Sequence, residues 1–296
     1  MICLALLGAG YLPLIVMSFV PALAKTARSI WPILFTETVT VLSVVAAFWI
    51  GGWVLVLSLL ALAFRCSFEA ADVVLRRLPG LPRPYAALQI AAAVTGGVSI
   101  LWLLAVPLAV VSLITLAALI AAFAGLRHGG AAPDSARGVA LDLLLFPLLP
   151  LILFITAGLS GGFGAWLLVA FLLVETFDSY ASLGGKLFGR TRAFPVLSPN
   201  KTVEGLLIGA AMLMLTAAVV GAILAGLPVL ASGAVALFVG ALTLIGDLTG
   251  SRLKRRSGVK DFPPVMPHQG GLLDIADAWI VAGAGLVAVI SLTAAG

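Results

Sequence analysis

Apolar segments of membrane-spanning length recur along this 296-residue chain and leave little room for a water-soluble domain. A transmembrane helix needs about 20 apolar residues. Hydrophobic residues make up 62% of the chain and charged residues 10%, whereas soluble domains carry about 25% charged residues. We therefore predict an all-α, polytopic integral membrane protein with a single transmembrane domain over 1–296. The apolar segments are 2–23, 31–49, 51–64, 85–104, 106–125, 140–157, 162–177, 203–225, 229–246 and 277–295.

The connections between these segments are of two kinds. One kind is charged and holds the Lys and Arg residues, and the other is short and uncharged, as at 105–107 and 226–228. The two kinds alternate if 31–64 is a hairpin of two short helices that turns at Gly51-Gly52. All Lys and Arg then lie on one side, which the positive-inside rule makes cytoplasmic. Ten helices with both chain ends outside follow, whereas one span or a re-entrant element at 31–64 gives nine and an amino terminus inside.

Much of the charge lies in two polar stretches, 178–204 and 247–277. Together they hold nine of the 17 Lys and Arg residues and six of the 12 Asp and Glu residues. The alternation of connections places both stretches on the same side of the membrane. We therefore expect the chemistry of this protein in these two stretches.

The second polar stretch begins with a polar helical face. Asp247, Ser251, Lys254 and Arg255 are spaced by four, three and one residues, so a helix that leaves the membrane presents them together. A glycine pair further on lets backbone amides approach a ligand, and the next helix begins there with the positive end of its dipole towards the loop. This spacing predicts an anion site that includes Lys260, Asp261, Gly270, Gly271, Asp274 and Asp277.

The first polar stretch follows an acidic pair and contains a candidate phosphate ligand. Glu175 and Asp178 lie at i and i+3 near the end of an apolar helix, where ionised groups are costly, so we expect them to face a polar cavity. Ser198 is a candidate N-cap of the following membrane helix. Lys201 and Thr202 then fall in the first turn of that helix and reach a phosphate.

Carboxylates beside many cations at a membrane boundary suit a nucleotide with its divalent metal. Mg²⁺ binds one or two carboxylates and takes waters and phosphate oxygens as its other ligands, while Lys and Arg neutralise the remaining phosphate charge. Asp247 and Asp274 are the first choice for the metal. The alternative is that the acids only pair with neighbouring cations, which then set the topology and contact lipid headgroups.

At these residues the sequence resembles the phosphatidate cytidylyltransferases, the CDP-diacylglycerol synthases. The family signature runs Ser, two residues, Lys-Arg, four residues, Lys-Asp, then Pro-Gly-His-Gly-Gly, two residues, Asp-Arg, one residue and Asp. The matching residues are Ser251, Lys254, Arg255, Lys260, Asp261, Pro267, Gly270, Gly271, Asp274 and Asp277. Upstream residues resemble a second recurring block of the family. They are Asp178, Tyr180, Ala181, Phe188, Gly189, Ser198, Pro199, Lys201, Thr202, Glu204 and Gly205. The resemblance covers 170–280, the expected catalytic half, whereas 1–140 matches only as a region of hydrophobic helices.

Two departures fall inside the signature. His268-Gln269 stands where the family has Gly-His, and Ile275 replaces the arginine that follows the first Asp of the final pair. A Gln side chain can donate a hydrogen bond but carries no charge. An Ile side chain neither donates a hydrogen bond nor carries a charge. Arg252 or Arg256 could compensate for the missing guanidinium. The alternative is a divergent family member that binds CTP or an anionic lipid without the usual turnover.

The resemblance implies transfer of CMP from CTP to phosphatidate, which forms CDP-diacylglycerol and pyrophosphate in phospholipid biosynthesis. It implies Mg²⁺ as a cofactor and suggests a monovalent cation such as K⁺ beside it. The candidate catalytic residues are Asp247, Lys254, Asp274 and Lys201. The candidate substrate-binding residues are Ser198, Thr202, Ser251, Arg255, Lys260, Gln269, Gly270 and Gly271. The candidate metal ligands are Asp247, Asp274, Asp277 and Asp178.

The expected partners are CTP, phosphatidate or a related lipid phosphate, and membrane lipids, with no nucleic acid. A bacterial inner membrane is the expected location, with the active-site loops in the cytoplasm. The sequence leaves the acyl portion of the lipid open, and also the oligomeric state, including a homodimer.

Two other interpretations concern charges outside the polar stretches. Intramembrane acids such as Glu37, Asp142 and Glu175 can mark the ion path of a transporter, although most charge lies in the connections. The amphipathic segment 67–78 is expected to lie on the cytoplasmic interface, either as a membrane-surface helix or as a plain connecting helix.

Overall fold

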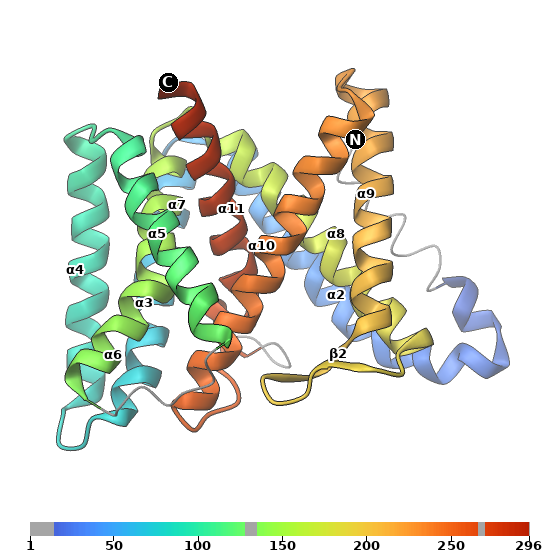
Figure 1. Cartoon of the computed structure of the whole chain (residues 1–296), viewed down its shortest axis with the longest axis horizontal. Helices are drawn as coiled ribbons and strands as arrows, with labels where there is room; N and C mark the ends of the chain where they lie inside the picture. The colour runs from blue at the N-terminus through green and yellow to red at the C-terminus, as the bar shows by residue number, and fades with distance from the viewer. Residues whose placement is uncertain (1–14, 128–134, 266–269, 296) are drawn as a thin grey trace.

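A computed structural model describes residues 15–127, 135–265 and 270–295 of the chain. The fold is a bundle of long helices with one small hairpin of strands (Figure 1). In chain order the elements are α2 (Pro21–Ile50), α3 (Gly52–Val74), η1 (Leu75–Arg77), α4 (Arg83–Leu103), α5 (Leu108–Arg127), α6 (Ala136–Leu143), η2 (Leu144–Leu148), α7 (Leu149–Leu159), α8 (Gly164–Phe188), β1 (Arg192–Phe194), β2 (Ser198–Thr202), α9 (Val203–Ala225), α10 (Val229–Arg256) and α11 (Leu272–Ala295).

Eight helical segments in this part of the chain are long and apolar enough to cross a membrane, which confirms the predicted all-α, polytopic fold. Seven of them are α3 with η1, α4, α5, α8, α9, α10 and α11, and the eighth joins α6, η2 and α7. A shorter apolar helical stretch, Thr38–Ile50, belongs to α2. The predicted first helix, 2–23, lies largely outside the described residues, so the total of nine or ten spans stays a prediction.

The charged and uncharged connections lie at opposite ends of the bundle, as the alternation predicted (Figure 1). The connections α3–α4 and α10–α11 and the β1–β2 hairpin lie at the lower end in this view. The connections α4–α5 and α9–α10 lie at the upper end, together with the carboxyl terminus. We call the lower end the charged end, because it gathers both polar stretches.

The expected break in the 31–64 run lies at Gly51, which separates α2 from α3 with φ 64° and ψ −151°. The second helix of this pair is not short, because α3 continues to Val74. The prediction that 67–78 lies on a membrane interface is therefore wrong. Glu69, Ala70, Ala71 and Val73 are fully buried, since this part of α3 packs inside the bundle and its acid finds partners there.

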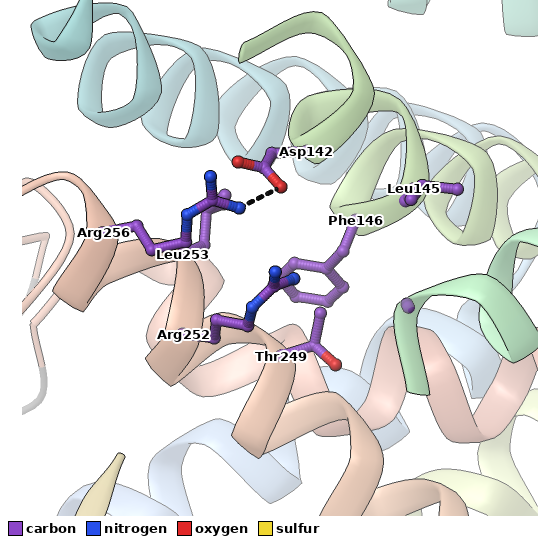
Figure 2. A pocket seen from close by; sticks show the side chains of 8 residues that line it. Asp142, Leu145, Phe146, Thr249, Arg252, Leu253 and Arg256 are labelled. Carbon is purple, nitrogen blue, oxygen red and sulfur yellow. Dashed lines mark hydrogen bonds and ion pairs between the residues drawn. The ribbon is translucent and has the colours of Figure 1, made fainter. Parts of the chain in front are cut away.

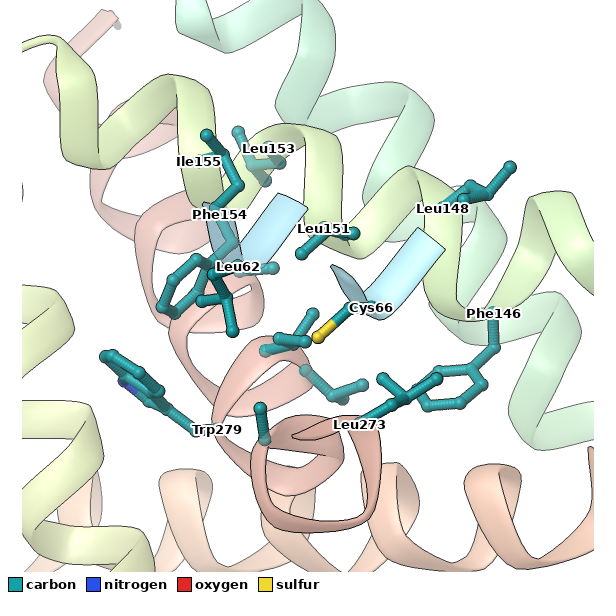
Figure 3. Packing of buried hydrophobic residues seen from close by; sticks show 14 of the residues in the cluster. Leu62, Cys66, Phe146, Leu148, Leu151, Leu153, Phe154, Ile155, Leu273 and Trp279 are labelled. Atoms are coloured by element: carbon teal, nitrogen blue, oxygen red, sulfur yellow. The ribbon is translucent and has the colours of Figure 1, made fainter. Parts of the chain in front are cut away.

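Helix α11 is the central helix of the bundle. About four-fifths of its span is buried (78%), compared with 11% for α9. Trp279 fixes α11 laterally, with its ring 4.8 Å from Phe154 and 4.9 Å from Phe171 between centroids, and its Nε1 donates to Leu167 O at 2.8 Å. Figure 3 shows Trp279 and Phe154 together in this core. Edge-to-face aromatic contacts and a satisfied indole N–H hold the helix in one position.

Small residues let the helices of the carboxyl-terminal half approach closely. A Cβ on Gly205 of α9 would lie 2.6 Å from Ala181 O of α8, and one on Gly209 would lie 2.8 Å from Ala181 Cβ. Without a hydrophobic driving force between helices in lipid, such close backbone approach is the main source of association. Helix α9 thus packs against α8 and also contacts α10, while much of its surface remains exposed.

Candidate active site

The charged end of the bundle contains a row of carboxylates and ammonium groups drawn from four elements. Lys201 Nζ of β2 lies 3.7 Å from Asp178 Oδ1 of α8 and 3.3 Å from Asp247 Oδ2 of α10. Asp277 of α11 lies within electrostatic reach of Asp247, of Lys254 and of Asp274. Lys254 forms an ion pair with Asp274. The structure thus brings together six predicted site residues that the sequence places in two separate stretches.

Lys201 reaches this row from a hairpin and not from a helix. Strands β1 and β2 are antiparallel, with Arg192 opposite Thr202 and Phe194 opposite Ser198. Helix α9 begins after them, and its N-cap is Thr202, whose Oγ1 accepts from Gly205 N at 3.2 Å. The predictions of a Ser198 cap and of Lys201 and Thr202 in the first helical turn are therefore wrong. Thr202 supplies the same capping oxygen four residues later, so the extended segment before it is free to form a strand.

A carboxylate closes the base of this hairpin. Glu204, in the first turn of α9, accepts from Arg190 N at 3.0 Å and from Thr191 N at 3.1 Å. These contacts attach the strand that carries Lys201 to both α8 and α9. Lys201 is therefore held at a defined place beside Asp178 and Asp247 although its strand lies at the surface.

The surroundings of Lys201 keep it protonated. Burial disfavours the charged ammonium, but the carboxylates of Asp178 and Asp247 outweigh burial, so the pKa of Lys201 lies above its ordinary value of 10.5. A raised pKa of this kind contributes stability that is complete below the unfolded-state value and is lost only as pH rises through the folded-state value. Lys201 therefore carries a positive charge at this place throughout the neutral range.

Asp277 is buried where α10 and α11 cross. A Cβ on Gly250 would lie 2.5 Å from Asp277 Oδ2, and one on Gly246 would lie 2.8 Å from the backbone oxygen of the same residue. Two glycines one turn apart on α10 therefore make room for Asp277. Its Oδ1 accepts a hydrogen bond from Ala278 N at 2.6 Å. Its other oxygen, Oδ2, faces Gly250 of α10.

Asp274 is bound on both of its oxygens. Oδ1 pairs with Lys254, and Oδ2 accepts from Phe262 N at 2.8 Å and from Gly271 N at 2.9 Å. Lys254 Nζ also lies 5.3 Å from the centre of the Phe262 ring, a cation–π contact. This buried pair joins the end of α10 to the start of α11.

The amides at the start of α11 bind carboxylates of the protein itself. Gly271 N donates to Asp274, and the next two amides, of Leu272 and Leu273, donate to Glu69 of α3 at 3.0 and 2.8 Å. The expectation that these amides and the helix dipole receive an external anion is therefore wrong, because acidic side chains already satisfy them. The sequence predicts no role for Glu69. Its spacing of four residues from Arg65 is the local pattern that indicates an ion pair at this position.

The remaining predicted site residues are spread around this row. Ser251 is buried on α10, on the side of Asp247 and Lys254, which confirms the predicted helical face. Arg255 is exposed, and its Nη1 donates to Val259 O at 3.1 Å. Lys260 is exposed in the α10–α11 connection. Gln269 and His268 lie outside the described residues.

The opposite face of α10 carries a second group of charges. Asp142 of α6 accepts from Arg77 at 2.5 Å and from Arg256 at 2.7 Å, and all three side chains are largely buried. Figure 2 shows Asp142, Arg252 and Arg256 around a small pocket, with Arg256 directed at Asp142. Arg252 lies against Gly125 of α5. Both arginines thus lie on the α10 face opposite Asp274, so the expectation that either replaces the guanidinium missing at Ile275 is wrong.

The Asp142 network joins η1, α6 and α10, and its loss should lower the stability of the protein. We expect Asp142→Asn to lower the free energy of unfolding by about 3 kcal/mol, because it removes a buried carboxylate shared by two guanidinium groups. Thermal unfolding in detergent measures the effect. The control is Asp72→Asn, whose partner Arg76 is 3.5 Å away and 40% exposed, with an expected loss below about 1 kcal/mol. Equal losses in the two variants would contradict a structural role for the network.

Comparison with known proteins extends the resemblance to most of the chain. A sequence model of the cytidylyltransferase family matches residues 33–293, well beyond the 170–280 region of the signature. The chain is 40% identical over 119 residues to uncharacterized protein YnbB of Escherichia coli K12, covering 40% of each chain. It is 39% identical over 142 residues to a phosphatidate cytidylyltransferase of Helicobacter pylori, covering 45% of this chain and 50% of that protein. It is 36% identical over 116 residues to a phosphatidate cytidylyltransferase of Staphylococcus aureus, covering 39% and 45%.

These alignments span half or less of the length of each relative. The family model is the broader match, since it includes the helices α3 to α7 that carry Glu69 and Asp142 as well as the charged row. The chain belongs to the cytidylyltransferase family.

Proposed function

We propose that this protein transfers CMP from CTP to phosphatidate and releases pyrophosphate. The observation that carries the proposal is the row of alternating carboxylates and ammonium groups from Asp178 to Asp274, at one end of a bundle of membrane-spanning helices. Two lysines in the row suit a triphosphate, and two acids beside them, the partly exposed Asp247 and the buried Asp277, suit its metal. The named relatives in Helicobacter pylori and Staphylococcus aureus support the same reaction.

The reaction makes few demands beyond position and charge. A lipid phosphate oxygen attacks the α-phosphorus of CTP, a new phosphorus–oxygen bond forms, and the bond to the β-phosphate bridging oxygen breaks. Pyrophosphate leaves with that electron pair. The lipid phosphate is already ionised, so no strong general base is needed, and catalysis rests on positioning and on neutralising the triphosphate. Lys201 and Lys254 supply two of the required positive charges.

Asp247 and Asp277 fit Mg²⁺. Asp247 Oδ2 is buried and accepts no hydrogen bond within the described part of the chain, although Lys201 is near. Among the described residues, no group of three or more Asp, Glu, His or Cys side chains forms a complete metal site. Mg²⁺ suits such a site, because one or two carboxylates hold it while phosphates and waters complete its coordination. When bound, the metal would neutralise charge on the triphosphate. Asp274 and Asp178 remain predicted ligands, each with a cation already beside it.

The charged end is also where the two substrates can meet. An amphiphilic lipid places its phosphate at the membrane boundary, and the basic connections at this end favour the cytoplasmic side under the positive-inside rule. We therefore place the site at the cytoplasmic surface of a bacterial inner membrane, where CTP is available. A monovalent cation beside Mg²⁺ and a homodimer belong to the same proposal.

The proposal is tested with purified protein in detergent, CTP, Mg²⁺ and phosphatidate, by following pyrophosphate release. We expect release that requires all three additions and yields a CDP-lipid. Thermal stabilisation by CTP without turnover would instead favour a divergent family member, as the Ile275 departure suggests. Absence of both turnover and stabilisation would overturn cytidylyl transfer.

A further inference from the structure

We infer that Glu69 is a positioning residue of the active site, which fixes the start of α11 and with it the carboxylates of Asp274 and Asp277. Position 69 lies on α3, far from the signature at 251–277. The consequence for turnover rests on the proposed cytidylyl transfer, whereas the contact with α11 does not.

Glu69 binds the first two amides of α11. Its side chain is fully buried, Oε1 accepts from Leu272 N at 3.0 Å, and Oε2 accepts from Leu273 N at 2.8 Å. The first N–H groups of a helix have no partner within the helix, and a negative charge there also interacts favourably with the helix dipole. One carboxylate from a distant helix thus performs the work of a local N-cap.

Arg65 extends this contact to the loop before α11. Its Nε donates to Glu69 Oε1 at 2.6 Å, and its Nη2 donates to Pro263 O at 3.1 Å. The adjacent residue, Phe262, donates its backbone N–H to Asp274. The Arg65–Glu69 pair therefore holds the last described residues of the loop as well as the first turn of α11.

The carboxylate of Glu69 is tightly packed against the start of α11. Gly271 is buried against Glu69, and a Cβ added there would run into Glu69 Oε2 and lie 2.7 Å from Phe262 Cβ. The requirement for glycine at 271 is therefore explained by packing against this carboxylate. Gly271→Ala disturbs the same contact from the opposite side.

Asp274 lies one residue beyond the amides that Glu69 binds, and Asp277 follows one turn later. A displacement of about 1 Å at reacting groups costs about 100-fold in rate. We expect Glu69→Gln to lower kcat between about 10-fold and 100-fold. The KM for phosphatidate should stay near that of the wild type, because Glu69 is buried away from any lipid. A merely structural defect would instead reduce the amount of folded protein at unchanged kcat per folded molecule.

The experiment combines amide hydrogen exchange with kinetics on the full-length protein in detergent. The exchange rate is followed in peptides that cover Leu272 and Leu273. We expect faster exchange there and a lower kcat in Glu69→Gln and in Gly271→Ala. The matched control is Asp72→Asn on the same helix, which removes the carboxylate that pairs with Arg76 and should leave both readouts unchanged. A double variant of Glu69 and Gly271 should be less than additive, since both changes affect one contact.

The exchange rate tests the contact between Glu69 and α11, and kcat tests the positioning role of Glu69. Unchanged exchange at the start of α11 in Glu69→Gln would overturn the contact, and faster exchange at unchanged kcat would overturn the positioning role. If the wild-type protein showed no turnover with CTP, the proposed function would fail, and the exchange data alone would still decide whether Glu69 fixes α11.

Discussion

Asp247→Asn is expected to lower kcat about 1,000-fold, equivalent to about 4 kcal/mol of transition-state stabilisation, while the protein stays folded. Asp247 Oδ2 is buried and accepts no hydrogen bond from the described residues, and its ion-pair contact with Lys201 at 3.3 Å leaves coordination sites for a metal ion. An asparagine keeps the shape of the side chain but removes the negative charge that a divalent cation requires. Pyrophosphate release at saturating CTP measures the loss.

The melting temperature separates this effect from misfolding. Asp247 Oδ2 accepts no hydrogen bond in the described structure, and Lys201 keeps Asp178 as its second partner, so the replacement should lower the melting temperature only slightly. Asp72→Asn, which alters the pair of the partly buried Asp72 with the exposed Arg76, should retain wild-type turnover. Full activity in Asp247→Asn would remove this residue from the metal site, and a large loss of stability would show a structural role in its place.

Lys254→Met is expected to be the most destabilising substitution in the charged row, with a loss of about 3 kcal/mol in the free energy of unfolding and loss of turnover. The change leaves the carboxylate of Asp274, whose side chain is 9% exposed, without its ammonium partner. It also removes the contact of Lys254 with the Phe262 ring. Thermal unfolding in detergent and pyrophosphate release give the two readouts.

The partner of Lys254 supplies the sharpest control. The double variant Lys254→Met/Asp274→Asn removes both charges of the pair and leaves only Asp277 without its nearby ammonium group, so part of the stability should return although turnover does not. Lys186→Met, an exposed lysine at the end of α8, should change stability by less than about 0.5 kcal/mol. A double variant as unstable as the sum of its single variants would contradict the pairing seen here.

The sequence predicted the features that depend on local spacing. Apolar length identified the membrane helices, and the break at Gly51 followed from two glycines within an apolar run. The spacing of Asp247, Ser251 and Lys254 placed them on one helical face, which α10 confirms. These predictions succeeded because helix periodicity relates residues that are close in the chain.

One error concerns a choice between two neighbouring caps, and the other concerns partners that lie far apart in the chain. Ser198 was read as a cap because a Ser before a helix is a common signal, yet Thr202 was equally able to cap and left room for the strand with Lys201. Glu69 and Asp72 gave 67–78 the pattern of a surface helix. Its burial is possible because Glu69 finds the amides of Leu272 and Leu273, about 200 positions later, and no local pattern contains that information.

The long reach of Glu69 also has a consequence for biosynthesis. A nascent chain that ends before Leu272 already carries the hairpin with Lys201, the acid at position 247 and the arginine pair around Asp142. It lacks α11, whose first turn Glu69 binds, so α3 and α11 must meet before the row of charges is complete. The carboxylates of Asp274 and Asp277 therefore join the row only when α11 enters the bundle, and truncation before Leu272 removes them even where every earlier helix is inserted.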